Sequence, residues 1–196
     1  MSAYTPETLP LVAGERPTPA VPSGVLGMLI FVVAEAMLFA GLVSAFTIIR
    51  ASAVVWPPRD QPRLPVEETA LNTAALLVSG VLLFLAQRAL RRDRAAAARL
   101  LLISLLLGVF FVTFQGAEWV RLIGQGLTLT SSSLGSFFYL IIGLHALHAV
   151  AAVALLAHAS LGLRRGWLTS NQLATAAVFW YFVVGVWPVL YFRVYL

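Results

Sequence analysis

Cysteine and lysine are both missing from this sequence of 196 residues, and charged residues of any kind are scarce. Without cysteine, the chain offers no disulfide, thiolate metal site, cysteine nucleophile or iron–sulfur cluster. Charged residues make up 11 % of the chain, whereas a soluble domain has about 25 %. This low content excludes an ordinary soluble globule, a disordered chain and a nucleic-acid-binding chain.

Long apolar runs take the place of the missing charge. Hydrophobic residues make up 60 % of the chain, and its mean hydropathy is +0.91. Five apolar stretches cover about residues 25–49, 69–90, 100–123, 134–163 and 173–196. Each is long enough to cross a bilayer core of about 30 Å as a helix, and none alternates as a barrel strand does. We therefore predict an all-α membrane protein whose residues 25–196 form a bundle of five transmembrane helices.

The first 24 residues differ from the rest because they are polar and rich in proline. This segment lacks the charged, apolar and cleavage regions of a signal peptide. The five prolines disfavour a helix; they are Pro6, Pro10, Pro17, Pro19 and Pro22. We predict a flexible tail outside the bilayer over residues 1–24.

Arginine supplies every basic residue, and its distribution predicts the orientation of the chain. With five spans, one side carries more arginines than the other. That side holds Arg16, Arg88, Arg91, Arg92, Arg94, Arg99, Arg164 and Arg165, and the opposite side holds Arg50, Arg59, Arg63, Arg121 and Arg193. Because basic residues concentrate in cytoplasmic loops, we predict a cytoplasmic N-terminus and an external C-terminus. The basic loops are also expected to contact anionic lipid head groups.

Glu35 lies mid-way along the first span, where a carboxylate is costly unless it is protonated or paired. Two interpretations remain open, namely a proton-exchanging carboxyl and a protonated acid that packs by hydrogen bonding to a neighbouring helix. Glu118 lies nearer the end of the third span. The spacing favours an interfacial ion pair with Arg121, three residues further on, and the alternative is an inward contact with a histidine of the fourth span.

His145 and His148 lie three residues apart on one face of the fourth span. His158, about three turns further on, is predicted at the interface. One helix cannot supply both axial ligands of a haem, and the Glu-x-x-His pattern of a di-iron site is absent. We therefore predict no metal site and no catalytic residue, and we expect the pair to hydrogen-bond carboxyls such as Glu35 or Glu118.

Tryptophan has a default interpretation in a membrane chain, which is anchoring at the interface or contact with lipid. It applies to Trp56, Trp119, Trp167, Trp180 and Trp187. The predicted lipid-binding or interfacial residues are Trp56, Arg91, Arg92, Arg94 and Trp180.

An ordered set of motifs resembles subunit III of haem-copper oxidases, the family of cytochrome c and quinol oxidases. The set spans about 170 residues. It comprises the run from Gly27 to Phe39 around Glu35, Trp56-Pro-Pro58 with Leu71-Asn-Thr73, Gln115-Gly-Ala-Glu118-Trp119, and Gly143-Leu-His145-Ala-Leu-His148. The resemblance is to the short form of the family, which lacks two N-terminal helices.

The last span departs from the family pattern at two positions. Tyr181 stands where the family has histidine, and Val184 stands where it has aspartate. Any role that needs that pair is therefore in doubt for this chain.

The resemblance implies a non-redox subunit of a respiratory terminal oxidase in a bacterial-type plasma membrane. It implies contact with subunit I, with subunit II and small subunits also present, and it allows a respiratory supercomplex. Haem and copper are then expected in the partner subunits and not in this chain, which would bind phospholipid and support proton uptake during oxygen reduction.

Three alternatives remain open at this point. One is subunit III of a quinol oxidase or of a nitric-oxide-reductase-associated homologue. Another is a stand-alone transporter or proton channel, although the sequence has no broken helices and no internal repeat. The last is a haem-binding membrane cytochrome, which would show a Soret band from the isolated chain.

Overall fold

The computed structural model describes residues 21–56, 62 and 64–196, and its regular structure is helical throughout that part of the chain. The helices are α1 (Ser23–Ser52), α2 (Val66–Ala89), α3 (Arg94–Gly124), α4 (Ser133–Arg165) and α5 (Ser170–Leu190), and a π-helical turn over Tyr191–Tyr195 continues α5. All five helices are long and apolar enough to cross a membrane. The predicted all-α fold with five spanning helices is confirmed.

The helices begin and end near the predicted limits, and most of them run several residues beyond the apolar stretch. α3 begins at Arg94 and α4 ends at Arg165 because polar residues continue the helix outside the apolar core. The predicted tail of residues 1–24 lies mostly outside the described residues, and its last two residues, Ser23 and Gly24, belong to α1.

Capping side chains fix the turns between the helices. Asp93 begins α3 by accepting hydrogen bonds from the N–H groups of Ala95 and Ala96, at 2.8 and 3.0 Å. Gly166 ends α4 in the left-handed conformation, at φ 84°, which glycine adopts without a steric cost. Thr169 and Gln172 form a capping box at the start of α5. Two short turns, α2–α3 and α4–α5, therefore hold their helices in antiparallel pairs.

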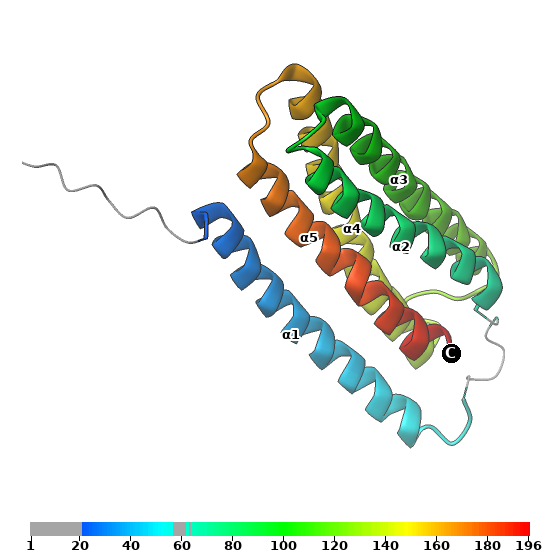
Figure 1. Ribbon diagram of the computed structural model, residues 1–196. Coiled ribbons are helices and arrows are strands. Elements are labelled where there is room, and N and C mark those ends of the chain that lie inside the picture. The colour runs from blue at the N-terminus through cyan, green and yellow to red at the C-terminus, as the bar shows by residue number, and fades with distance from the viewer. Residues whose placement is uncertain (1–20, 57–61, 63) are drawn as a thin grey trace, which may run out of the picture.

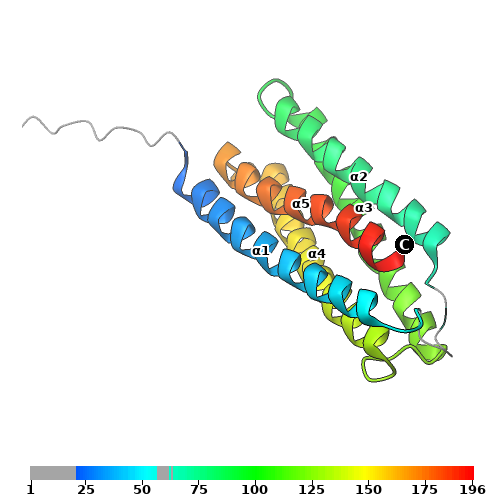
Figure 2. The same cartoon turned by 90° about the horizontal axis from the view of Figure 1, so that it is seen from below.

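α5 is the centre of the bundle (Figure 1). It packs against α1, α2 and α4, while α2 packs most extensively on α3. α1 lies at the edge away from α2 and α3, as the turned view also shows (Figure 2), and it joins the bundle through α5 and α4.

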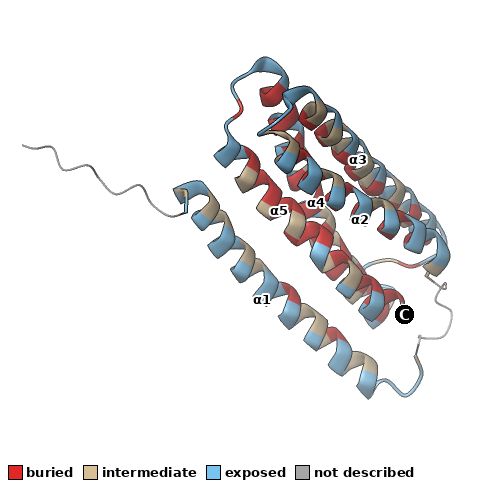
Figure 3. Cartoon of the chain, viewed as in Figure 1, coloured by how far each residue is buried: buried red, intermediate tan, exposed pale blue. Residues whose placement is uncertain are grey.

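Burial follows this arrangement (Figure 3). Along α1 only Phe39 and Phe46 are buried, whereas ten residues of α5 are buried. The exposed apolar surface of α1 is what a bilayer or a second membrane subunit would cover.

Candidate functional site

Glu35 of α1 meets His148 of α4 at mid-depth in the bundle. The Nε2 atom of His148 lies 3.1 Å from the Oε2 atom of Glu35, and their side chains are only 10 % and 19 % exposed. Phe39, Phe179 and Phe182 surround the imidazole, with ring centroids 5.6 to 6.1 Å away. The structure thus brings two of the predicted site residues into one apolar enclosure.

The other ring nitrogen of His148 is hydrogen-bonded to the backbone of its own helix. The Nδ1 atom lies 2.8 Å from the carbonyl oxygen of Leu144. A carbonyl only accepts, so Nδ1 carries a hydrogen, and the second imidazole nitrogen, Nε2, faces Glu35. Nε2 and the carboxyl therefore place an ionisable base next to an ionisable acid. The arrangement suits a group that holds or passes a single proton.

His145 lies one turn away from His148 and takes a different position. It is 1 % exposed and packs against Trp187, with ring centroids 5.0 Å apart, and against Phe39 and Phe111. Within the described part of the chain, neither of its ring nitrogens has a hydrogen-bond partner. The expected hydrogen bond from His145 to a carboxyl is therefore not formed here, because its ring stacks inside the core.

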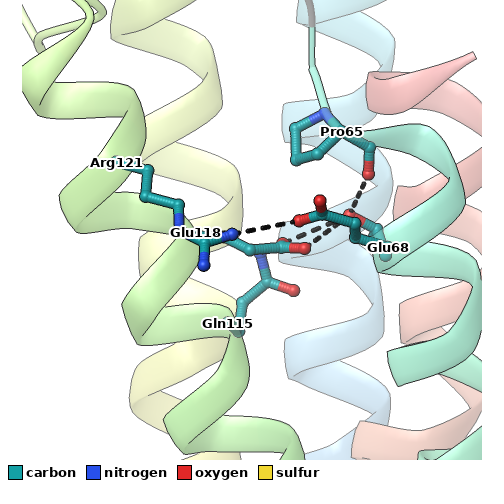
Figure 4. Close-up of polar contacts among 6 residues, drawn as sticks. Pro65, Glu68, Gln115, Glu118 and Arg121 are labelled. Carbon is teal, nitrogen blue, oxygen red and sulfur yellow. Dashed lines mark hydrogen bonds and ion pairs between the residues drawn. The ribbon is translucent and has the colours of Figure 1, made fainter.

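Glu118 of α3 is the second buried carboxyl, at 2 % exposure (Figure 4). Its Oε2 atom accepts a hydrogen bond from Nε2 of Gln115 at 2.9 Å and one from the hydroxyl of Thr69 at 3.2 Å. Gln115 also donates to the hydroxyl of Tyr195 at 3.0 Å, and it accepts from Nδ2 of Asn72 at 3.4 Å. This network connects α2, α3 and the last turn of the chain.

The predicted ion pair between Glu118 and Arg121 is wrong. Arg121 pairs instead with Glu68 of α2, at 3.3 Å, and both side chains are more than half exposed. Figure 4 shows Arg121 directed at Glu68. Glu118 instead has Thr69 and Gln115 as its hydrogen-bond partners. Successive positions of one helix point in different directions, so a spacing of three residues allows a pair without requiring it.

Comparison with known proteins shows which family this chain resembles. The model of the family described as cytochrome c oxidase subunit III matches residues 12–196. A probable cytochrome c oxidase subunit 3 of Nocardia farcinica (strain IFM 10152) is 33 % identical over 178 residues, which cover 87 % of this chain and 86 % of that protein. The cytochrome c oxidase subunit 3 of Bos taurus is 32 % identical over 189 residues, covering 91 % and 71 %.

The chain belongs to the cytochrome c oxidase subunit III family. It is thus a multi-pass membrane subunit of an oxidase complex with further subunits. In the part of this family member that the structure describes, no three side chains of histidine, aspartate or glutamate converge on a common point.

Trp180 overturns one prediction for this subunit III chain. It was expected at the interface or against lipid, but it is 0 % exposed, as is Trp187. Its indole N–H donates to the hydroxyl of Ser79 at 3.1 Å, and that of Trp187 donates to Thr73 at 2.8 Å. The hydroxyls of α2 satisfy both indoles inside the bundle, so neither needs the polar interface.

The remaining predicted contact residues lie at the two ends of this subunit. Arg91 and Arg92 are exposed in the α2–α3 turn, and Arg94 is exposed at the start of α3. Trp56 lies at the opposite end, where it is half-buried and packs edge-on against Phe46, with centroids 5.6 Å apart.

Sequence reasoning missed several partners in this subunit because they come from other helices. Thr69, Asn72, Gln115 and Tyr195 form the surroundings of Glu118. The sequence did indicate such partners, because the few uncharged polar side chains within a membrane span commonly form hydrogen bonds to other helices. Pairing them needs the packing order of the helices, which hydropathy does not supply.

Tyr181 and Val184, the two positions expected to differ from the family pattern, both contact α2 from α5. The hydroxyl of Tyr181 donates to Oε1 of Gln87 at 2.7 Å. Val184 lies close to Gly80. A side-chain carbon added at Gly80 would lie 3.1 Å from the Cγ1 atom of Val184. These positions therefore hold the two helices together in this member of the family.

Proposed function

We propose that this chain is the non-redox subunit III of a respiratory oxidase of the cytochrome c type, and that it supports proton uptake during oxygen reduction. In this proposal it packs on subunit I, binds phospholipid, and has subunit II and small subunits as further neighbours. The complex lies in a bacterial-type plasma membrane, where it can assemble into a respiratory supercomplex. Haem and copper belong to the partner subunits.

The contact between Glu35 and His148 is the observation that carries the proton role. The two groups lie 3.1 Å apart and are largely enclosed by apolar rings, so an acid and a base that could exchange a proton face each other inside the bundle. An intramembrane ionisable residue is costly, and such residues commonly mark proton relays. A packing role alone would be served equally well by an amide.

Packing on a larger subunit is supported by the outward face of α1. Large apolar side chains there are more than 40 % exposed, and they cluster on the side opposite Phe39 and Phe46. Among them are Leu26, Ile30, Val33, Met37 and Ile48. The face is mostly apolar, with Ser44 as an exposed polar residue on it, so subunit I and lipid chains both suit it.

Two substitutions at Glu35, made in the native complex, test the proton role. Glu35→Gln keeps the shape and a hydrogen-bond donor toward His148, so the complex should assemble nearly as the wild type does. The amide cannot release a proton, so the rate of proton uptake during turnover should fall. Uptake is measured with a pH-sensitive dye while oxygen consumption is followed.

Glu35→Ala is the matched control for packing. It removes the side chain and leaves His148 without its partner, so assembly should weaken by a few kcal/mol at most, about 1–3. Proton uptake by the Glu35→Gln complex at the wild-type rate would contradict the proton role. Complete and equal loss of assembly in both variants would show that the carboxyl itself is required for folding and would also contradict the proposal.

A further inference from the structure

A groove of about 620 Å³ lies at the end of α2. It is lined by Phe84, Gln87, Arg88, Ala89, Arg91 and Arg92. The groove lies far along the helix from both buried carboxyl sites, since Thr69 beside Glu118 belongs to the opposite end of α2. The contacts of Glu35 and Glu118 therefore do not explain it.

The groove is strongly cationic. Of the six lining residues that belong to the described part of the chain, three are arginines and none is aspartate or glutamate. Asp93, the next acid along the chain, accepts from the first N–H groups of α3. Its charge is thus directed at the helix end, and the arginines of the groove have no acidic lining residue to neutralise them.

The donors of the groove are partly positioned by other residues. The guanidinium carbon of Arg88 lies 4.5 Å from the ring centroid of Phe84, a distance at which the ring attracts the cation. Oε1 of Gln87 accepts from Tyr181, which leaves the NH₂ group of Gln87 as a donor. Guanidinium and amide donors together suit the acceptor oxygens of a phosphate.

An apolar surface continues from the groove along α2. Phe84 is 44 % exposed, and Leu77, Val81 and Leu85 are also more than 40 % exposed. Phe84 lines the groove, and the other three precede the arginines in α2, so they lead from the groove toward the apolar middle of the helix. A free phosphate would use only the donors, whereas a phospholipid would also use this apolar surface.

We propose that this groove binds the phosphate-bearing headgroup of an anionic phospholipid, with its acyl chains along α2. The groove is then the place where the phospholipid binding proposed above occurs, and the assignment rests on that part of the proposed function. Arg91 and Arg92 supply charge, Arg88 and Gln87 supply positioned donors, and Phe84 separates the headgroup from the acyl region.

Two double variants with the same change in charge test the site. R91Q/R92Q alters the groove, and R164Q/R165Q removes two exposed arginines at the end of α4 that do not line it. The full-length chain is purified with any subunits that accompany it, in micelles that contain phosphatidylglycerol and phosphatidylethanolamine. Native mass spectrometry measures the affinity for each lipid.

R91Q/R92Q should bind phosphatidylglycerol about tenfold or more weakly, because each arginine near an anionic headgroup contributes a separate attraction. R164Q/R165Q should stay within about threefold of the wild type, and neither variant should change the binding of phosphatidylethanolamine. Equal losses in both variants would show diffuse surface charge and overturn the proposal. Unchanged binding in R91Q/R92Q would overturn it too.

Competition with inorganic phosphate distinguishes a site for free phosphate from a site for a phospholipid headgroup. In a competition experiment, millimolar phosphate should displace phosphatidylglycerol only weakly, because phosphate lacks the acyl chains. Binding of phosphate as tight as that of the lipid would overturn the lipid assignment. The assay reads bound lipid for each chain, so its failure differs from a failure of the proposed oxidase role, which would appear as loss of the haem-containing partner.

Discussion

Glu118 lies inside the bundle, whereas Arg121, three residues further along α3, lies at its surface. Thr69 and Gln115 donate hydrogen bonds to the buried carboxyl, and Glu68 pairs with the exposed arginine. Removing a buried acceptor leaves a buried donor without a partner, which is costly. Removing one member of an exposed ion pair costs little, because water hydrates the other member. Neighbouring polar residues of one helix therefore contribute very differently to stability.

Substitution of these two residues should separate the two contributions. Glu118→Leu should lower the free energy of unfolding by about 1–3 kcal/mol, because it leaves a buried N–H of Gln115 without its acceptor. The hydroxyl of Thr69, in contrast, keeps the carbonyl oxygen of Pro65. Arg121→Gln should change it by about 1 kcal/mol or less. Denaturant unfolding of the purified chain in micelles measures both, and equal destabilisation by the two variants would contradict this account.

The residue-level predictions from sequence were limited by partners on other helices. The depth of Glu35 and His148 followed from their places within apolar stretches, and the structure brings these two together at 3.1 Å. The pairing of Glu118 with Arg121 was wrong, because helical spacing identifies neighbours along one helix only. The role of each predicted site residue stays a prediction.

At the scale of the helices, α5 is held by close approach of its aromatic residues to neighbouring helices. Gly108 of α3 lies against the indole of Trp180, and a side-chain carbon added there would lie 2.6 Å from the ring. Trp180 is fully buried and donates to Ser79 of α2, so it has little freedom to move away. The absence of a side chain at residue 108 thus leaves room for the indole of Trp180 against α3.

Alanine substitutions at two glycines of α3 test this contact. Gly108→Ala should destabilise the chain by about 1–3 kcal/mol through overpacking against Trp180. Gly116→Ala, with no atom within 4 Å of the added carbon, should be neutral or stabilising by up to about 1 kcal/mol because alanine favours helix. Thermal unfolding of both variants supplies the measurement, and a Gly108→Ala variant as stable as the wild type would refute the close contact.

The number and nature of the helices could be predicted because hydropathy reports directly on membrane spans. The environment of the tryptophans could not, because the same residue suits either an interface or a buried site with an acceptor. Ser79 and Thr73 of α2 supply those acceptors for Trp180 and Trp187. Only the packing of α2 on α5 shows that they do.

At the scale of the whole molecule, the two ends of the bundle differ in charge. The end with the α2–α3 and α4–α5 turns carries Arg91, Arg92, Arg164 and Arg165, all of them exposed. The opposite end carries Arg121, which is paired with Glu68, and also Arg50 and Arg193. This asymmetry favours the arginine-rich end on the cytoplasmic side.

The lack of cysteine makes this orientation straightforward to measure, since any introduced thiol is the only one. We expect a Leu129→Cys variant to react with a membrane-impermeant maleimide added outside intact cells. An Arg165→Cys variant should react only after the membrane is permeabilised. Both positions are exposed, and the reverse labelling pattern would contradict the predicted topology.

Purification of the complex from its native membrane tests the central claim most directly. The chain carries an affinity tag, the complex is isolated in mild detergent, and its subunits and absorbance spectrum are determined. The account predicts that a haem-copper subunit I accompanies the chain in equal amount and gives the haem spectrum. Repeated recovery of the intact chain without any haem-containing subunit would contradict it.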